Sequence, residues 1–140
     1  MNRQRVLVVE DDASVRGLVQ VILEDEGLEV FTAADGSEGL RLARELAPAA
    51  VVLDVMMPGL GGPEVIRRLR RDDGSLPFGV LVLTGAPETV ESLRDELGTD
   101  AVMEKPFDIG ALAARVRVLA QSGRFETPHD GHAPGARPPR

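Results

Sequence analysis

The chain has 140 residues, of which 43% are hydrophobic and 28% are charged, a composition typical of a globular protein that folds as one domain. No apolar run approaches the ~20 residues of a membrane span, and the first residues lead directly into a strand-like run. We therefore expect no membrane insertion, no secretory leader and a cytoplasmic location. The net charge of −7 argues against direct binding to nucleic acid, and the absence of cysteine excludes disulfides and thiolate ligands.

Five short apolar runs, separated by longer stretches with helical spacing, predict the strands of an α/β fold. They lie at residues 6–9, 28–33, 51–53, 80–83 and 101–103. Four of them lack the polar alternation of a half-exposed strand, which is typical of parallel strands covered on both faces. The run at 28–33 alternates more and is predicted to be an edge strand. The fold class that follows is a doubly wound, five-stranded parallel sheet flanked by five helices.

Helical spacing and capping signals place the first two helices. The first is expected to begin near Ser14 and to end at Gly27, because glycine can adopt the left-handed conformation that terminates a helix. Its predicted buried stripe is Val15, Leu18, Val19 and Ile22. The second helix is expected over residues 37–46, before Pro48.

Three further helices are predicted in the second half of the chain. The third takes Gly62 as its N-cap and Pro63 as its first residue, and buries Val65, Ile66 and Leu69. The fourth, over residues 87–97, has a thin apolar face of Val90, Leu93 and Leu97, so we expect it to be the least stable. The fifth takes Asp108 as its N-cap and buries Ile109, Leu112, Val116 and Leu119.

The helical pattern ends at Gln121, and the sequence beyond it is rich in proline and glycine without periodicity. Such a segment carries too little apolar surface to fold. We therefore predict one domain over residues 4–121 and a disordered tail over residues 122–140.

Polar residues follow four of the predicted strands at their carboxyl ends, where ligands bind in open parallel sheets. Residues 10–12 read Glu-Asp-Asp, Asp54 ends the third strand, Thr84 follows the fourth, and Lys105 follows the fifth. Because clustered carboxylates repel one another, the site needs a cation, and Mg²⁺ suits oxygen ligands. The Asp54 carboxylate can act as a nucleophile that forms an aspartyl phosphate, while Lys105 and Thr84 bind the phosphoryl oxygens.

Taken singly, each of these residues also has an ordinary structural interpretation, such as a solvated loop acid or the end of a strand. Asp54 is harder to explain in that way, because an acid directly after Val-Val-Leu at a buried strand end is costly without a partner. The joint appearance of these residues at four strand ends favours a functional site.

Four segments closely resemble the receiver domain of bacterial response regulators, the switch component of two-component signalling. They are residues 6–12, 53–59, 83–85 and 104–107, and the resemblance covers about residues 4–121. It implies the strand order 2-1-3-4-5 and a cis peptide bond between Lys105 and Pro106. It also implies a phosphoacceptor switch that is not an enzyme, apart from catalysing its own phosphorylation and dephosphorylation.

The resemblance also assigns roles to the site residues. Asp54 is the expected phosphoacceptor, Asp11 binds Mg²⁺ directly, and Glu10 acts through water. Met56 offers its backbone carbonyl to the metal, while Thr84 and Lys105 contact the phosphoryl group. The implied donor is a histidine kinase or a histidine phosphotransfer protein, and the output is an unidentified downstream protein in a two-component or phosphorelay pathway.

Two positions depart from the family, since Val102 stands where an aromatic residue is common and Gly61 where aspartate is frequent. Two other classes of protein fit the sequence less well. A haloacid-dehalogenase-like phosphatase needs a second acid two residues after its nucleophile, where this chain has Met56. A flavin-binding domain would not carry Glu-Asp-Asp as its phosphate loop. A full transcription factor is not expected, because about twenty residues follow the last predicted helix.

Overall fold

A computed structural model of the chain describes residues 3–122 and contains one five-stranded parallel sheet in the order β2-β1-β3-β4-β5. The strands are β1 (Arg5–Val9), β2 (Glu29–Ala33), β3 (Ala50–Asp54), β4 (Gly79–Thr84) and β5 (Val102–Glu104). The helices are α1 (Ala13–Asp25), α2 (Gly36–Leu46), α3 (Gly62–Leu69), α4 (Pro87–Leu97) and α5 (Ile109–Ser122), with a short 3-10 turn η1 (Thr99–Ala101). The expected fold class and strand order are confirmed.

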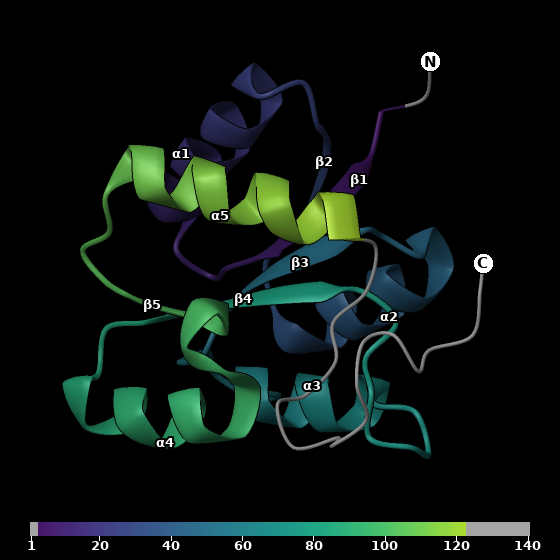
Figure 1. The fold of residues 1–140 in the computed structure, drawn as a ribbon, viewed down its shortest axis with the longest axis vertical. Helices are drawn as coiled ribbons and strands as arrows, with labels where there is room; N and C mark the ends of the chain where they lie inside the picture. The colour runs from purple at the N-terminus through teal and green to yellow at the C-terminus, as the bar shows by residue number, and fades with distance from the viewer. Residues whose placement is uncertain (1–2, 123–140) are drawn as a thin grey trace.

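The sheet is covered on both faces, with α1 and α5 on one side and α2, α3 and α4 on the other (Figure 1). Successive residues of a strand point to opposite faces, so β1 contributes to both cores. Val6 and Val8 pack with α1 and α5, and Leu7 and Val9 pack with the other three helices. The edge position predicted for β2 is also confirmed, and none of its first four residues is buried.

Two predicted core positions, Leu18 and Ile109, are wrong. Leu18 is 45% exposed because α1 packs through Val19, Ile22 and Leu23, and Leu18 lies about 140° around the helix from Leu23. Ile109 is 51% exposed, because α5 first reaches the core almost one turn later, at Leu112.

The predicted helix starts are close to the observed ones. For α1 the N-cap is Asp12, whose carboxylate accepts hydrogen bonds from the N–H groups of Ser14 and Val15. For α3 the N-cap is Gly61 rather than Gly62. Gly62 already lies within the helix, where an added Cβ would be 2.8 Å from the backbone oxygen of Asp54. Only glycine fits this close approach without a shift of the backbone.

The remaining helix predictions agree with the structure in most positions. The three residues expected on α4 are its buried residues, and Asp108 accepts a hydrogen bond from the N–H of Ala111 at the start of α5. The last helix extends one residue past the predicted end, to Ser122, and the rest of the predicted tail, 123–140, lies outside the described residues. No helix in the described part of the chain is long and apolar enough to span a bilayer.

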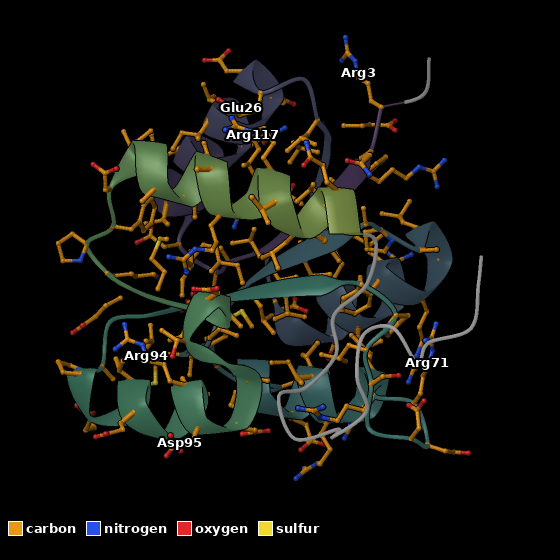
Figure 2. The ribbon with its side chains drawn as sticks, in the orientation of Figure 1. Arg3, Glu26, Arg71, Arg94, Asp95 and Arg117 are labelled. Atoms are coloured by element: carbon orange, nitrogen blue, oxygen red, sulfur yellow. The ribbon has the colours of Figure 1, made fainter. Side chains whose placement is uncertain are left out.

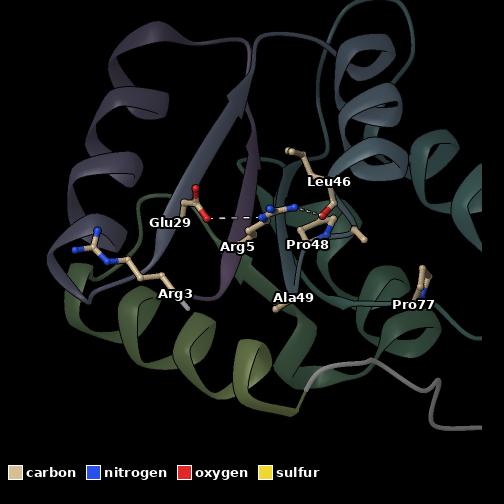
Figure 3. A pocket seen from close by; sticks show the side chains of 8 residues that line it. Arg3, Arg5, Glu29, Leu46, Pro48, Ala49 and Pro77 are labelled. Atoms are coloured by element: carbon tan, nitrogen blue, oxygen red, sulfur yellow. Dashed lines mark hydrogen bonds and ion pairs between the residues drawn. The ribbon is translucent and has the colours of Figure 1, made fainter. Parts of the chain in front are cut away.

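Charged side chains lie around the surface of the helices (Figure 2). Glu26, at the end of α1, forms an ion pair with Arg117 of α5 and joins the two helices that share one face of the sheet. At the amino ends of the strands, Arg5 pairs with Glu29 at 3.6 Å and donates to the carbonyl of Leu46 at 3.1 Å, within a pocket that Pro48 and Pro77 also line (Figure 3). This pocket lies at the opposite edge of the sheet from the polar residues predicted to form the site.

Candidate functional site

The strand register brings the predicted site residues to one edge of the sheet. Val9 pairs with Leu53, so the residues that come next, Glu10 and Asp54, lie side by side at the ends of β1 and β3. Thr84 pairs with Glu104, which places Lys105 directly beyond the end of β4. The parallel sheet therefore brings the residues at the carboxyl ends of four strands close together.

The site residues are buried to a degree that is unusual for polar side chains. Glu10 is 1% exposed, Asp54 is 4% exposed and Thr84 is fully buried. Buried carboxylates are costly unless they are paired or hydrogen-bonded, so their partners decide whether the site is stable.

Lys105 supplies the positive charge between the two buried acids. Its ammonium lies 3.0 Å from Glu10 Oε1 and 3.4 Å from Asp54 Oδ1. The other Glu10 oxygen accepts the N–H of Asp12 at 3.2 Å, and Asp54 Oδ1 also accepts the N–H of Met56 at 3.3 Å. One ammonium thus faces two carboxylates that the backbone also holds in place.

The charges shift the ionisation of both partners. Burial raises the pKa of Glu10, and the nearby Asp54 carboxylate adds to this rise, which together outweigh the opposing effect of the Lys105 hydrogen bond. Burial alone would lower the pKa of Lys105, but its hydrogen bond with Glu10 and the negative charges of Asp54 and Glu10 raise it. The ammonium is therefore held in its charged form, whereas burial favours the neutral form of Glu10 more than in an exposed glutamate.

Asp11 completes a group of three carboxylates. Oxygen atoms of Glu10, Asp11 and Asp54 all lie within 4.8 Å of one another, and Asp11 is exposed, which leaves the group open to solvent. Carboxylate oxygens are the ligands that Mg²⁺ prefers, and the ion keeps several waters of its own. Three carboxylates beside a single ammonium fit a divalent cation well.

The Thr84 hydroxyl forms hydrogen bonds with Thr89 and Ala86. Its Oγ1 lies 2.9 Å from Oγ1 of Thr89, in the first turn of α4, and accepts the N–H of Ala86 at 3.1 Å. Sequence reasoning did not identify Thr89 as part of the site. The signal available in the sequence is a second threonine five residues after the first, just inside the next helix.

Two further features surround the acids. Arg16, on α1, donates from Nη1 to the backbone oxygen of Glu10 at 2.9 Å and fixes the loop after β1, a contact that the sequence did not predict. The Met56 side chain is 60% exposed beside the site. The Lys105–Pro106 peptide bond is cis, as expected.

The sequence model described as the response regulator receiver domain matches residues 6–117, most of the chain. The chain belongs to the response regulator receiver domains. Response regulators are signalling proteins rather than conventional enzymes. Receiver domains are generally Mg²⁺-dependent and receive phosphoryl groups from histidine kinases. The cluster of Glu10, Asp11 and Asp54, which could hold a metal ion, agrees with this general property.

Individual proteins agree with this assignment to the receiver domains. The DNA-binding response regulator MtrA of Mycobacterium tuberculosis is 42% identical over 116 residues, which are 82% of this chain and 50% of MtrA. The Francisella response regulator 1452 receiver domain superposes with a TM-score of 0.72 at 30% identity, covering 86% of this chain and 98% of that one. Chemotaxis protein CheY4 of Vibrio cholerae superposes with a TM-score of 0.69 at 31% identity, covering 84% and 99%. The receiver spans about half the length of the curated relatives it matches.

Proposed function

We propose that this receiver accepts a phosphoryl group on the Asp54 carboxylate from a phosphohistidine donor and changes conformation to control a partner protein. The observation that carries the proposal is the buried Asp54, 3.4 Å from the Lys105 ammonium and within 4.8 Å of the Glu10 and Asp11 carboxylate oxygens. An acid in this setting is placed to react rather than to be solvated.

The reaction follows from the groups present. An Asp54 oxygen attacks phosphorus, the bond from phosphorus to the donor imidazole nitrogen breaks, and the imidazole leaves with that electron pair and takes up a proton. Lys105 neutralises charge on the transferred group as it arrives. Asp11, Asp54, the Met56 carbonyl and, through water, Glu10 would hold Mg²⁺, which would supply positive charge to offset the repulsion between the carboxylate and the phosphoryl group.

Further parts of the proposal concern the setting of the switch. We propose a cytoplasmic receiver at residues 4–121, whose last helix reaches Ser122, followed by a disordered tail. The donor is a histidine kinase or a histidine phosphotransfer protein. We propose a protein as the output partner, because a net charge of −7 disfavours direct contact with nucleic acid. DNA binding belongs to MtrA, of which this chain matches half.

Incubation with acetyl phosphate and Mg²⁺, followed by intact-protein mass spectrometry, tests the proposed site. We expect one added phosphoryl group on the wild type, none with chelator, and at most weak labelling of Asp54→Asn through the neighbouring acids. Asp25→Asn, which changes an exposed acid at the end of α1, is the matched control and should label like the wild type. Strong labelling of Asp54→Asn would refute the assignment, whereas weak labelling is expected when neighbouring acids accept in its place.

A further inference from the structure

The hydroxyl groups of Thr84 and Thr89 share a single set of hydrogen bonds, and their hydrogens can be assigned. Thr89 Oγ1 donates to the carbonyl oxygen of Ala86 at 2.7 Å, and a carbonyl can only accept. Each hydroxyl has one hydrogen, so Thr89 has none left for the 2.9 Å contact with Thr84. Thr84 must therefore donate in that contact, while it accepts from the N–H of Ala86 at 3.1 Å.

This assignment leaves Thr84 without a hydrogen for any other acceptor. Phosphoryl oxygens accept hydrogen bonds, so Thr84 can bind them only by withdrawing its hydrogen from Thr89. The alternative acceptor within reach, the carbonyl of Ala86, is 3.5 Å from Thr84 Oγ1 and already accepts the shorter bond from Thr89. The two bonds of Thr84, to Thr89 and to a phosphoryl group, exclude each other.

We propose that Thr89 is a positioning residue of the switch, whose hydroxyl competes with a phosphoryl group on Asp54 for the one hydrogen of Thr84. This inference rests on the proposed phosphorylation of Asp54. In the unphosphorylated receiver Thr89 holds Thr84 turned toward α4. Phosphorylation draws Thr84 away, so Thr89 loses its donor and α4 loses a tether to the end of β4.

The start of α4 lacks a side-chain cap. Its N-cap is Ala86, which offers no side-chain hydrogen bond, whereas Asp12 and Asp35 cap α1 and α2 with their carboxylates. The Thr89 side chain instead ties the first turn of α4 to the end of β4, through its bonds to the Ala86 carbonyl and the Thr84 hydroxyl. A change at Thr84 therefore acts on the least supported helix start of these three.

The test is the affinity for beryllofluoride, a mimic of the phosphoryl group, measured with Mg²⁺ for the wild type, Thr89→Val, Thr89→Ser, Thr84→Val and the Thr84→Val/Thr89→Val double variant. Valine keeps the branched shape of threonine and removes the hydroxyl, while serine keeps the hydroxyl. Removing one competing hydrogen bond should tighten binding by about fivefold in Thr89→Val, the equivalent of a typical net bond of ~1 kcal/mol. Thr89→Ser should match the wild type.

In the Thr84→Val background, Thr89→Val should have no effect, because the contested hydrogen is gone. Equal or weaker binding by Thr89→Val, or a tightening that persists without the Thr84 hydroxyl, would overturn the competition. Thr89→Ala serves the same comparison if Thr89→Val does not fold. A wild type that binds no beryllofluoride would instead overturn the proposed phosphorylation and this inference with it. Its melting temperature would then shift no more on adding beryllofluoride than that of Asp54→Asn.

The melting temperatures of the same variants without beryllofluoride give an independent test of the bond between the two hydroxyls. The losses caused by Thr84→Val and Thr89→Val should not add in the double variant, because both remove one shared bond. Fully additive losses would show that the two hydroxyls are not coupled and would overturn the inference even if Asp54 is phosphorylated.

Discussion

Lys105→Met removes the ammonium that lies between two buried carboxylates and keeps most of the side-chain volume. At an effective dielectric constant of about 20, unit charges at separations of 3.0 and 3.4 Å attract by about 5 kcal/mol each. The desolvation of all three groups offsets part of this attraction, and breaking a buried ion pair costs about 3 to 5 kcal/mol. Because the Lys105 side chain is 25% exposed, we expect a loss near the lower limit, about 3 kcal/mol.

The loss should appear in chelator at neutral pH as a melting temperature lowered by about 10 °C. Mg²⁺ should stabilise Lys105→Met more than the wild type, because the ion replaces the missing positive charge. The pKa of Glu10 is already raised and should rise further in the variant. A carboxyl whose pKa is higher in the folded state stabilises the fold below its ordinary pKa of 4.5, and this contribution is lost as the pH rises through the folded value. The gap between variant and wild type should therefore shrink as the pH falls toward 4.5.

Urea unfolding of both proteins in chelator, across pH 4.5 to 8, measures this effect. Arg41→Met is the matched control, because Arg41 pairs with Glu38 and Glu45 on the exposed face of α2 and should cost less than ~1 kcal/mol. A Lys105→Met variant as stable as Arg41→Met at pH 7, or a gap that widens as the pH falls, would refute the electrostatic account of the site.

Three further predictions use stability as the readout. Asp11→Ala should weaken Mg²⁺ binding and leave the melting temperature in chelator unchanged or slightly higher, because it relieves repulsion among carboxylates; a large drop would mean that Asp11 is a structural cap. Gly36→Ala should cost about 1 to 3 kcal/mol by overpacking, since an added Cβ would overlap the carbonyl oxygen of Leu60. Gly17→Ala in α1, where an added Cβ has nothing within 4 Å, should instead stabilise by about 0.5 to 1 kcal/mol. Equal denaturation midpoints for these two variants would contradict the packing seen around α2. Truncation after Ser122 should leave the melting temperature and the phosphorylation unchanged, and a drop of several degrees would contradict the predicted disorder of the tail.

The sheet could be predicted because its strands are buried on both faces. Such strands appear as short apolar runs whatever their neighbours, and the alternation in residues 28–33 distinguished the edge strand. Helix faces were predicted less well, because periodicity gives the direction of a stripe but not its width. The stripe of α1 is centred on Val19, Ile22 and Leu23, which leaves Leu18 outside it.

The positions of the site residues could be predicted for a related reason. The carboxyl ends of parallel strands meet at one edge, so Glu10, Asp54 and Lys105 had to lie near each other once the strands were placed. Their partners could not be predicted, because these depend on the paths of loops and on side-chain conformations. The bond between Thr84 and Thr89 depends on the turn through Ala86, and the contact of Arg16 with Glu10 depends on the position of α1.

The bond between Glu10 and Lys105 joins residues 95 positions apart, at the ends of the first and the last strands. A chain still being synthesised from its amino terminus acquires all three acidic groups long before it acquires the ammonium that lies between them. Until β5 joins the sheet, the carboxylates repel each other with no internal cation, and contacts of such long sequence separation form slowly. The protein's only lysine is thus synthesised after all of these acids, and a chain that stops before residue 105 carries the acidic pocket without the charge that stabilises it.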